Sequence, residues 1–233
     1  MCNKAYIDFG IANLSKEDVN GKDVIEVGSL DLNGSLRSIV ERLRPQQYTG
    51  VDILKGTGVD LVCEAEELLE FFGYEKFDIV ISTELIEHVR DWQKVIGNFK
   101  KLLKPDGVLL ITTRSKGYGY HGYPFDYWRY ELTDMRIIFS DFIIEAIDKD
   151  PLVPGVFIKV RKPVVFIEND ISKYQLYSII NNKRCVEVGN FEILFFKVTY
   201  VLHDILSKIL PIPVKAIIKR IIHKIKRRQV EVK

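Results

Sequence analysis

The sequence predicts an α/β domain built on a doubly wound, mostly parallel sheet of seven strands. Short apolar runs alternate with segments of helical periodicity through the first two thirds of the chain. One of these runs, residues 24–27, ends in Gly28 and a small, polar, turn-rich segment. That is the pattern of a first buried strand leaving its sheet toward a helix, where doubly wound domains bind nucleotide-like cofactors.

The remaining elements follow from apolar runs and the residues that end them. Strands are expected at 24–27, 48–53, 59–63, 77–82, 108–113, 142–148 and 155–161, and helices at 3–20, 35–43, 92–103 and 132–139. The first helical segment is expected to lie over the cofactor pocket, and residues 104–107 to form a turn before the fifth strand. Pro151 and Pro154 mark a hairpin-like connection, which makes the last strand antiparallel.

Composition excludes several classes of protein. A hydrophobic content of 47% and a charged content of 28% are globular values, so wholesale disorder is excluded. The three cysteines are few, odd in number and widely spaced, which predicts neither a disulfide framework nor a metal site. Together with an N-terminus that lacks a signal-peptide core, they predict a cytoplasmic protein.

Charge is unevenly distributed along the chain. The net charge is +2, but residues 211–233 carry eight Lys and Arg against Glu231 alone, so the rest of the chain is at about −5. An acidic main domain argues against a nucleic-acid partner.

The C-terminal third is expected to be an addition to the main domain. Residues 163–210 form an extension of uncertain structure, and the apolar run 191–210 is interrupted by charges, which makes it a poor membrane span. Residues 211–233 predict a basic amphipathic helix, with isoleucines on one face and Lys and Arg around the rest. Through residues 211–228 it is expected to contact an anionic membrane peripherally. The alternative is packing on its own domain or on a partner subunit.

The first glycine turn carries a clue to the cofactor. Gly28 is not followed by the glycines of the G-x-G-x-x-G fingerprint, and Glu26 lies two residues before it. A carboxylate there would repel a pyrophosphate, but it suits a cofactor with a cationic amino-acid end. Asp52, about two dozen residues further on, is placed to accept the hydroxyls of a ribose. An ordinary turn of some other α/β protein remains the alternative.

Three segments resemble one protein family. VIEVGSLDLNG resembles motif I of class I SAM-dependent methyltransferases, and FDIVISTELIEHV resembles motif IV of the small-molecule members. LLKPDGVLLITT is also similar to that family, and the resemblance covers about residues 8–162. It implies a methyltransferase domain at residues 1–162 and S-adenosylmethionine (SAM) as cofactor.

The resemblance also implies which residues bind the cofactor. Carried over by position, they are Glu26, Gly28, Ser29, Asp52, Ile53, Glu64, Ala65, Thr83 and Glu84. Glu64 is one methylene longer than the Asp usual in the family, and acids near it also suit the first turn of a helix.

An aromatic, glycine-rich segment follows the fifth strand and is the candidate acceptor site. Residues 114–131 lie where open α/β sheets place their ligands. Tyr123, Asp126 and Arg129 are the predicted acceptor-binding residues, whereas Trp128 and Tyr130 are expected to pack on the domain.

Two histidines are candidates for a general base. His88 follows the fourth strand and His121 lies in the aromatic segment. A base near an acceptor hydroxyl accelerates transfer by about 10²–10⁴-fold. Neither is needed if the acceptor is already acidic.

The expected function is therefore that of a SAM-dependent O-methyltransferase acting on a small or lipid-linked acceptor. The acceptor is expected to be a hydroxyl of a sugar or cell-surface glycan precursor. Two alternatives stay open: a methyltransferase for quinone-type or other small molecules, and a non-catalytic SAM-binding scaffold at a membrane.

Overall fold

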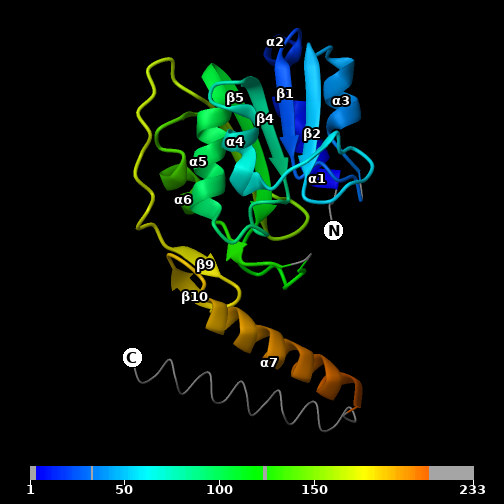
Figure 1. Ribbon diagram of the computed structural model, residues 1–233, viewed down its shortest axis with the longest axis vertical. Coiled ribbons are helices and arrows are strands. Elements are labelled where there is room, and N and C mark those ends of the chain that lie inside the picture. Colours follow the sequence, from blue (N-terminus) through cyan, green and yellow to red (C-terminus); the bar gives the residue numbers. More distant parts are fainter. Residues whose placement is uncertain (1–3, 33, 123–124, 210–233) are drawn as a thin grey trace. The chain divides into compact units, whose positions relative to one another are not determined.

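The structure is a computed structural model that describes residues 4–32, 34–122 and 125–209 (Figure 1). The chain divides into two compact units, Met1–Val188 and Gly189–Lys233. The first unit contains the strands β1 (Asp23–Val27), β2 (Gln47–Asp52), β3 (Leu61–Val62), β4 (Phe77–Thr83), β5 (Leu103–Arg114), β6 (Trp128–Arg129), β7 (Ile143–Lys149), β8 (Gly155–Arg161), β9 (Leu176–Ser178) and β10 (Lys183–Cys185). Its helices are α1 (Lys4–Asn13), α2 (Lys16–Val19), α3 (Arg37–Arg42), the 3₁₀ turn η1 (Ala65–Glu67), α4 (Leu68–Phe72), α5 (Trp92–Leu102) and α6 (Leu132–Ile138).

Seven strands form the main sheet in the order β3-β2-β1-β4-β5-β8-β7. Neighbours from β3 to β5 pair in parallel, and β8 pairs antiparallel with both β5 and β7. The order reverses at β1, which lies between β2 and β4. This confirms the predicted doubly wound sheet and its antiparallel last strand.

Helices cover both faces of the sheet. Alternate residues of the central strands pack against α1 and α3. Together they form one core that includes Tyr6, Val24, Val40, Ile81 and Leu110. In Figure 1, α1 and α3 lie beside β1 and β2, away from α4, α5 and α6. The strands are apolar on both faces because both faces are covered.

The N-terminal helices do not cover the pocket, contrary to the expectation from sequence. Tyr6 and Phe9 are buried against the sheet, and Phe9 packs 5.3 Å from Phe157 between ring centroids. Burial of these aromatic rings holds α1 on the sheet face. Its link to the loop after β1 is the Tyr6 hydroxyl, which donates to the Gly34 carbonyl at 2.7 Å.

The expected turn before the fifth strand is an irregularity inside β5. Phe77 pairs with Leu103 and Ile79 pairs with Val108, so residues 104–107 are accommodated between two ladder positions. Asp106 adopts a φ of 64° there. The backbone turns locally, as the Lys-Pro-Asp-Gly sequence predicts, without ending the strand.

Residues beyond Lys162 continue the first unit as far as Val188. There β9 pairs antiparallel with β10 and with β6, the short strand of the aromatic segment. The second unit contains α7 (Asn190–Ile209). Within the described ranges, no helix combines the length and apolarity that a membrane crossing needs. The predicted basic helix at 211–233 lies outside the described residues.

A buried lysine joins α5 to the segment after α6. The Lys100 ammonium is inaccessible to solvent and lies 2.7 Å from Asp141, whose side chain is equally buried. It also donates to the Ile138 carbonyl at 2.8 Å and to Asn169 Oδ1 at 2.7 Å. Burial lowers the pKa of Lys100, against the raising effect of Asp141.

Replacing Lys100 with alanine should therefore destabilise the domain by about 3–5 kcal/mol, because it leaves Asp141 charged and unpaired in the interior. The neighbouring Lys101 is 41% exposed and lies 3.5 Å from Glu168, so Lys101→Ala should cost no more than about 1 kcal/mol. Urea unfolding of both variants measures the difference. Equal losses would contradict the structural role of Lys100.

Candidate active site

One cavity of about 520 Å³ lies at the carboxyl ends of β1, β2 and β4. Its volume falls within the range of about 300–1,000 Å³ typical of small-molecule sites. The structure places all nine predicted cofactor residues in its lining: Glu26, Gly28, Ser29, Asp52, Ile53, Glu64, Ala65, Thr83 and Glu84. His88 and His121 line the same cavity.

The turn after β1 depends on Gly28. Its φ is 83°, a left-handed conformation that glycine adopts without strain. Its N–H donates to the Val51 carbonyl of β2 at 2.9 Å. A Cβ at this position would lie 3.1 Å from the Leu85 side chain, so the turn lies closely against the segment after β4.

Glu26 is a buried carboxyl at the cavity wall. It is 2% exposed, and Glu26 Oε2 accepts a hydrogen bond from the Tyr48 hydroxyl at 2.7 Å. Burial raises the pKa of Glu26 to about 7, although the Tyr48 hydrogen bond opposes the shift. Without a cationic partner, ionising this group in the folded state is unfavourable.

The raised pKa of Glu26 predicts a pH-dependent cost to folding. The folded state retains its proton between pH 4.5 and about 7 while the unfolded chain loses it, so stability falls as pH rises through that window. Glu26→Gln should remove the cost, which is about 3 kcal/mol above pH 7 and absent near pH 4.5. Thermal unfolding of the ligand-free variant should show a gain at high pH alone. Glu70→Gln, at an exposed position of α4, serves as control.

Asp52 is held in place by the backbone around it. Its carboxylate accepts hydrogen bonds from the Leu30 N–H at 3.2 Å and the Leu54 N–H at 3.0 Å. Asp52 is half-buried and faces the cavity, so the carboxylate is oriented before any ligand binds.

The turn after β3 is held by a residue that no pattern in the sequence singles out. The Asn98 side-chain amide of α5 donates to the carbonyls of Ala65 at 2.9 Å and Glu66 at 3.0 Å. Ala65 is buried and Glu64 is exposed at the rim. The asparagine would have been visible only as a polar residue on the buried side of an amphipathic helix.

Glu84 directly follows β4 and has a strained backbone conformation. Its φ is 55°, which is uncommon for a residue with a Cβ. Glu84 Oε1 accepts from Thr112 Oγ1 at 3.0 Å, and Glu84 forms an ion pair with the buried Arg114. Arg114 also lies 3.1 Å from Asp150, so the end of β4 is tied to β5 and to the hairpin before β8.

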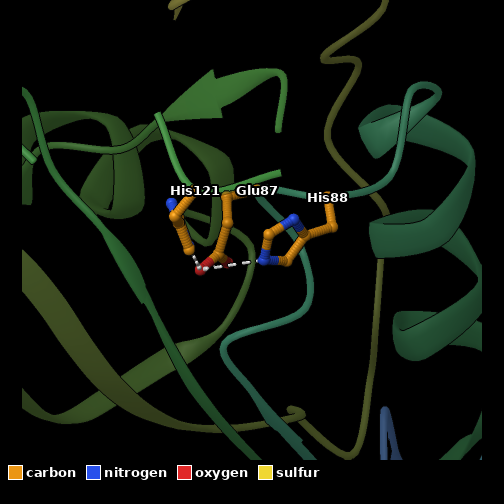
Figure 2. A group of neighbouring side chains, drawn as sticks. All are labelled: Glu87, His88 and His121. Carbon is orange, nitrogen blue, oxygen red and sulfur yellow. Dashed lines mark ion pairs between the residues drawn. The ribbon is translucent and has the colours of Figure 1, made fainter. Parts of the chain in front are cut away.

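His88 and His121, at another part of the cavity wall, converge on Glu87, which is buried behind them (Figure 2). Glu87 Oε1 lies 4.0 Å from His88 Nε2 and 3.7 Å from His121 Nε2. The imidazole rings meet edge to face with centroids 4.8 Å apart. The two predicted catalytic histidines, 33 positions apart in sequence, are therefore neighbours in space.

Asp126 and Arg129 lie behind this wall. Both are buried, and Arg129 Nη1 is 2.5 Å from Asp126 Oδ1. Neither is among the residues that line the cavity, so their contact with an acceptor stays a prediction. Tyr123, the third predicted acceptor residue, lies outside the described residues. Trp128 and Tyr130 are fully buried, which confirms that they pack on the domain.

The Asp126–Arg129 pair supports His121. Asp126 Oδ2 lies 2.8 Å from His121 Nδ1 and also accepts the His121 backbone N–H at 3.0 Å. Burial opposes protonation of His121, but hydrogen bonding to Asp126 and the charge of Glu87 raise its pKa to about 9. In the absence of a ligand, His121 is a poor proton acceptor near neutral pH.

A family model described as "Methyltransferase domain" matches residues 4–146. The chain therefore belongs to this family, and the resemblance to class I SAM-dependent methyltransferases is confirmed. The cofactor predicted with it, SAM, is that of the class.

Individual relatives match over shorter stretches. A ubiquinone biosynthesis O-methyltransferase of Actinobacillus pleuropneumoniae serotype 7 is 51% identical over 115 residues, covering 47% of this chain and 45% of that protein. The corresponding protein of Idiomarina loihiensis is 31% identical over 109 residues, or 41% and 44% of the two chains. The chain thus spans less than half the length of these curated relatives.

Solved structures share the fold at low identity. The 1,6-didemethyltoxoflavin-N1-methyltransferase of Burkholderia thailandensis, with bound S-adenosylhomocysteine, matches with a TM-score of 0.56 and 16% identity over 69% of this chain and 80% of that one. A [4+2]-cyclase matches with a TM-score of 0.53 and 16% identity over 68% and 80%. The shared fold alone therefore does not indicate which reaction this site performs.

Proposed function

We propose that this protein transfers a methyl group from SAM to a hydroxyl of a small, ring-bearing acceptor. The observation that carries the proposal is one cavity with two different ends. One end carries Glu26 and Asp52, and another part of its wall carries His88 and His121, with Glu87 buried behind them. The first suits a cationic amino acid and a ribose, and the second suits a polar acceptor group.

The residues present fit the cofactor. SAM supplies an already activated methyl group, so the protein has to bind, orient and exclude water. Buried Glu26 would be ionised by the ammonium of the methionyl end, and the preoriented Asp52 carboxylate would accept the ribose hydroxyls. Ala65 and Glu64 would lie by the adenine, while Thr83 and Glu84 line the wall at the end of β4.

The acceptor class is supported by the lining and by the relatives. Phe125 and Tyr127 line the cavity together with the two histidines, which suits a flat ring with a polar substituent. The curated relatives named above are O-methyltransferases of ubiquinone biosynthesis. These observations favour a phenolic or quinol-type ring, with a sugar hydroxyl of a glycan precursor as the next class to assay.

Asp52→Ala should weaken SAM binding by about 1–3 kcal/mol, because ribose hydroxyls would lose a buried acceptor. That is roughly a 5- to 150-fold rise in dissociation constant by calorimetry. Asp52→Asn keeps an acceptor oxygen and should lose less. Unchanged affinity for both variants, with their thermal unfolding also unchanged, would exclude Asp52 from the cofactor site.

An acceptor panel tests the reaction. Matched rings that carry a hydroxyl, an amine or a methyl ether should show methyl transfer to the hydroxyl alone, measured as S-adenosylhomocysteine formed and by mass spectrometry. Transfer to the amine alone would overturn the proposed O-methylation. Binding of SAM without transfer to any phenol or sugar in the panel would favour the alternative of a non-catalytic SAM-binding scaffold.

Membrane contact through residues 211–228 is a separate part of the proposal, which would bring the enzyme to a lipid-linked acceptor. The basic residues there should each contribute about 1 kcal/mol near an anionic leaflet. The full chain should therefore sediment with anionic vesicles at low salt and detach as salt rises. A variant with Lys215, Lys219, Arg220 and Lys224 changed to glutamine should remain in the supernatant. Sedimentation of that variant at the level of the wild type would contradict an electrostatic attachment.

A further inference from the structure

Three atoms able to bind a metal surround one point at the cavity wall. Glu87 Oε1 is the common neighbour of His88 Nε2 and His121 Nε2, and the three ligand atoms lie within 4.8 Å of one another (Figure 2). Two of them come from the segment after β4 and the third from the aromatic segment. The sequence predicts no metal here, because the two histidines lie 33 positions apart and form no local ligand motif.

The hydrogen bonds of the rings leave their Nε2 atoms as acceptors. His88 Nδ1 lies 2.5 Å from the Phe125 carbonyl oxygen, which accepts but cannot donate, so Nδ1 carries the proton. His121 Nδ1 lies 2.8 Å from the Asp126 carboxylate and donates to it in the same way. In the neutral rings, both Nε2 lone pairs then point toward the oxygen of Glu87. Carbonyl and carboxylate partners of this kind commonly orient metal-binding histidines.

Among the described residues, one carboxylate oxygen of Glu87 accepts no hydrogen bond. Its side chain is fully buried, and Oε2 accepts from Thr113 Oγ1 at 2.8 Å. Among the described residues, Oε1 has no hydrogen-bond partner, since both Nε2 atoms lie beyond hydrogen-bond distance. Positive charge beside this buried oxygen is favourable. In the empty site the protonated His121 ring supplies it, and a metal ion that displaces the Nε2 proton would supply it instead.

We propose that Glu87 Oε1, His88 Nε2 and His121 Nε2 bind one divalent transition-metal ion, of which zinc is the best representative. Two imidazoles and one carboxylate are ligands that zinc and its first-row neighbours accept. Tetrahedral ligands about 2.1 Å from an ion lie about 3.4 Å apart, so the present spacings need only small side-chain shifts to close.

The ion would keep an open position toward the acceptor. The side chains of His88 and His121 are 16% and 20% exposed and line the cavity, whereas Glu87 closes the buried side. An acceptor hydroxyl bound there would have its pKa lowered and its oxygen oriented. This role rests on the proposed function, but binding of the ion does not.

The test is zinc and cobalt binding to the purified full chain after treatment with a chelator. Calorimetry should show one tight zinc ion per chain. Glu87→Gln, His88→Gln and His121→Gln should each weaken it at least tenfold, while His203→Gln, a histidine of the second unit, should not. Cobalt should give the visible absorption of nitrogen and oxygen ligation without a thiolate charge-transfer band. Such a band would indicate ligation by Cys63, which also lines the cavity.

Binding of S-adenosylhomocysteine to the same samples separates the two proposals. Retained cofactor-product binding in a variant that has lost zinc shows that the variant is folded and the metal site is specific. No zinc binding by a wild type that binds S-adenosylhomocysteine would overturn the metal site alone. A thiolate band, or zinc affinity unchanged in the three ligand variants, would overturn it as well. Zinc binding without any binding of SAM or its product would instead count against the proposed function and leave the metal site standing.

Discussion

Parallel pairing of β1 with β4 is the constraint on which the site depends. Glu26 pairs with Ile81, so the residues that follow the two strands emerge side by side at one edge of the sheet. The connections to β2 and to β5 run in opposite directions along the sheet, because the strand order reverses at β1. The gap between them is the cavity, as expected at the switch point of a doubly wound sheet. Gly28 allows the close contact with Leu85 that brings its two walls together.

Buried charge around this cavity is arranged in two ways. Arg129 with Asp126, and Arg114 with Glu84 and Asp150, are ion pairs that hold loops in place. Glu26 and Glu87 have no Lys or Arg within ion-pair distance among the described residues, and both line or border the cavity. In the empty protein Glu26 is favoured in its protonated form and Glu87 is balanced by the protonated His121, so each site can exchange a proton for a cationic ligand. The two acids therefore point to two cationic occupants, the ammonium of the cofactor and the proposed metal ion.

Local sequence patterns were sufficient for the sheet and for the set of residues at one end of the cavity. The strands follow from apolar runs. The turn at Gly28, the acid at Asp52 and the segment after β4 each come directly after a strand, and all nine predicted cofactor residues line one cavity. The packing of α1 was not predictable in this way, because its apolar residues do not specify which surface they cover. The cluster at Glu87 was missed for a related reason. Its geometry depends on how residues 125–130 pack against the segment after β4, through contacts such as the Tyr127 N–H with the Glu87 carbonyl that form only on folding.

A crystal structure of the protein with S-adenosylhomocysteine would test the central claim most directly, namely that one cavity binds the cofactor at Glu26 and the acceptor at the histidines. The structure should show the ammonium of the ligand at the Glu26 carboxylate, its ribose at Asp52 and its sulfur facing the wall that contains Glu84, Leu85 and His88. A ligand bound outside this cavity, or bound within it with the ammonium turned away from Glu26, would contradict the account.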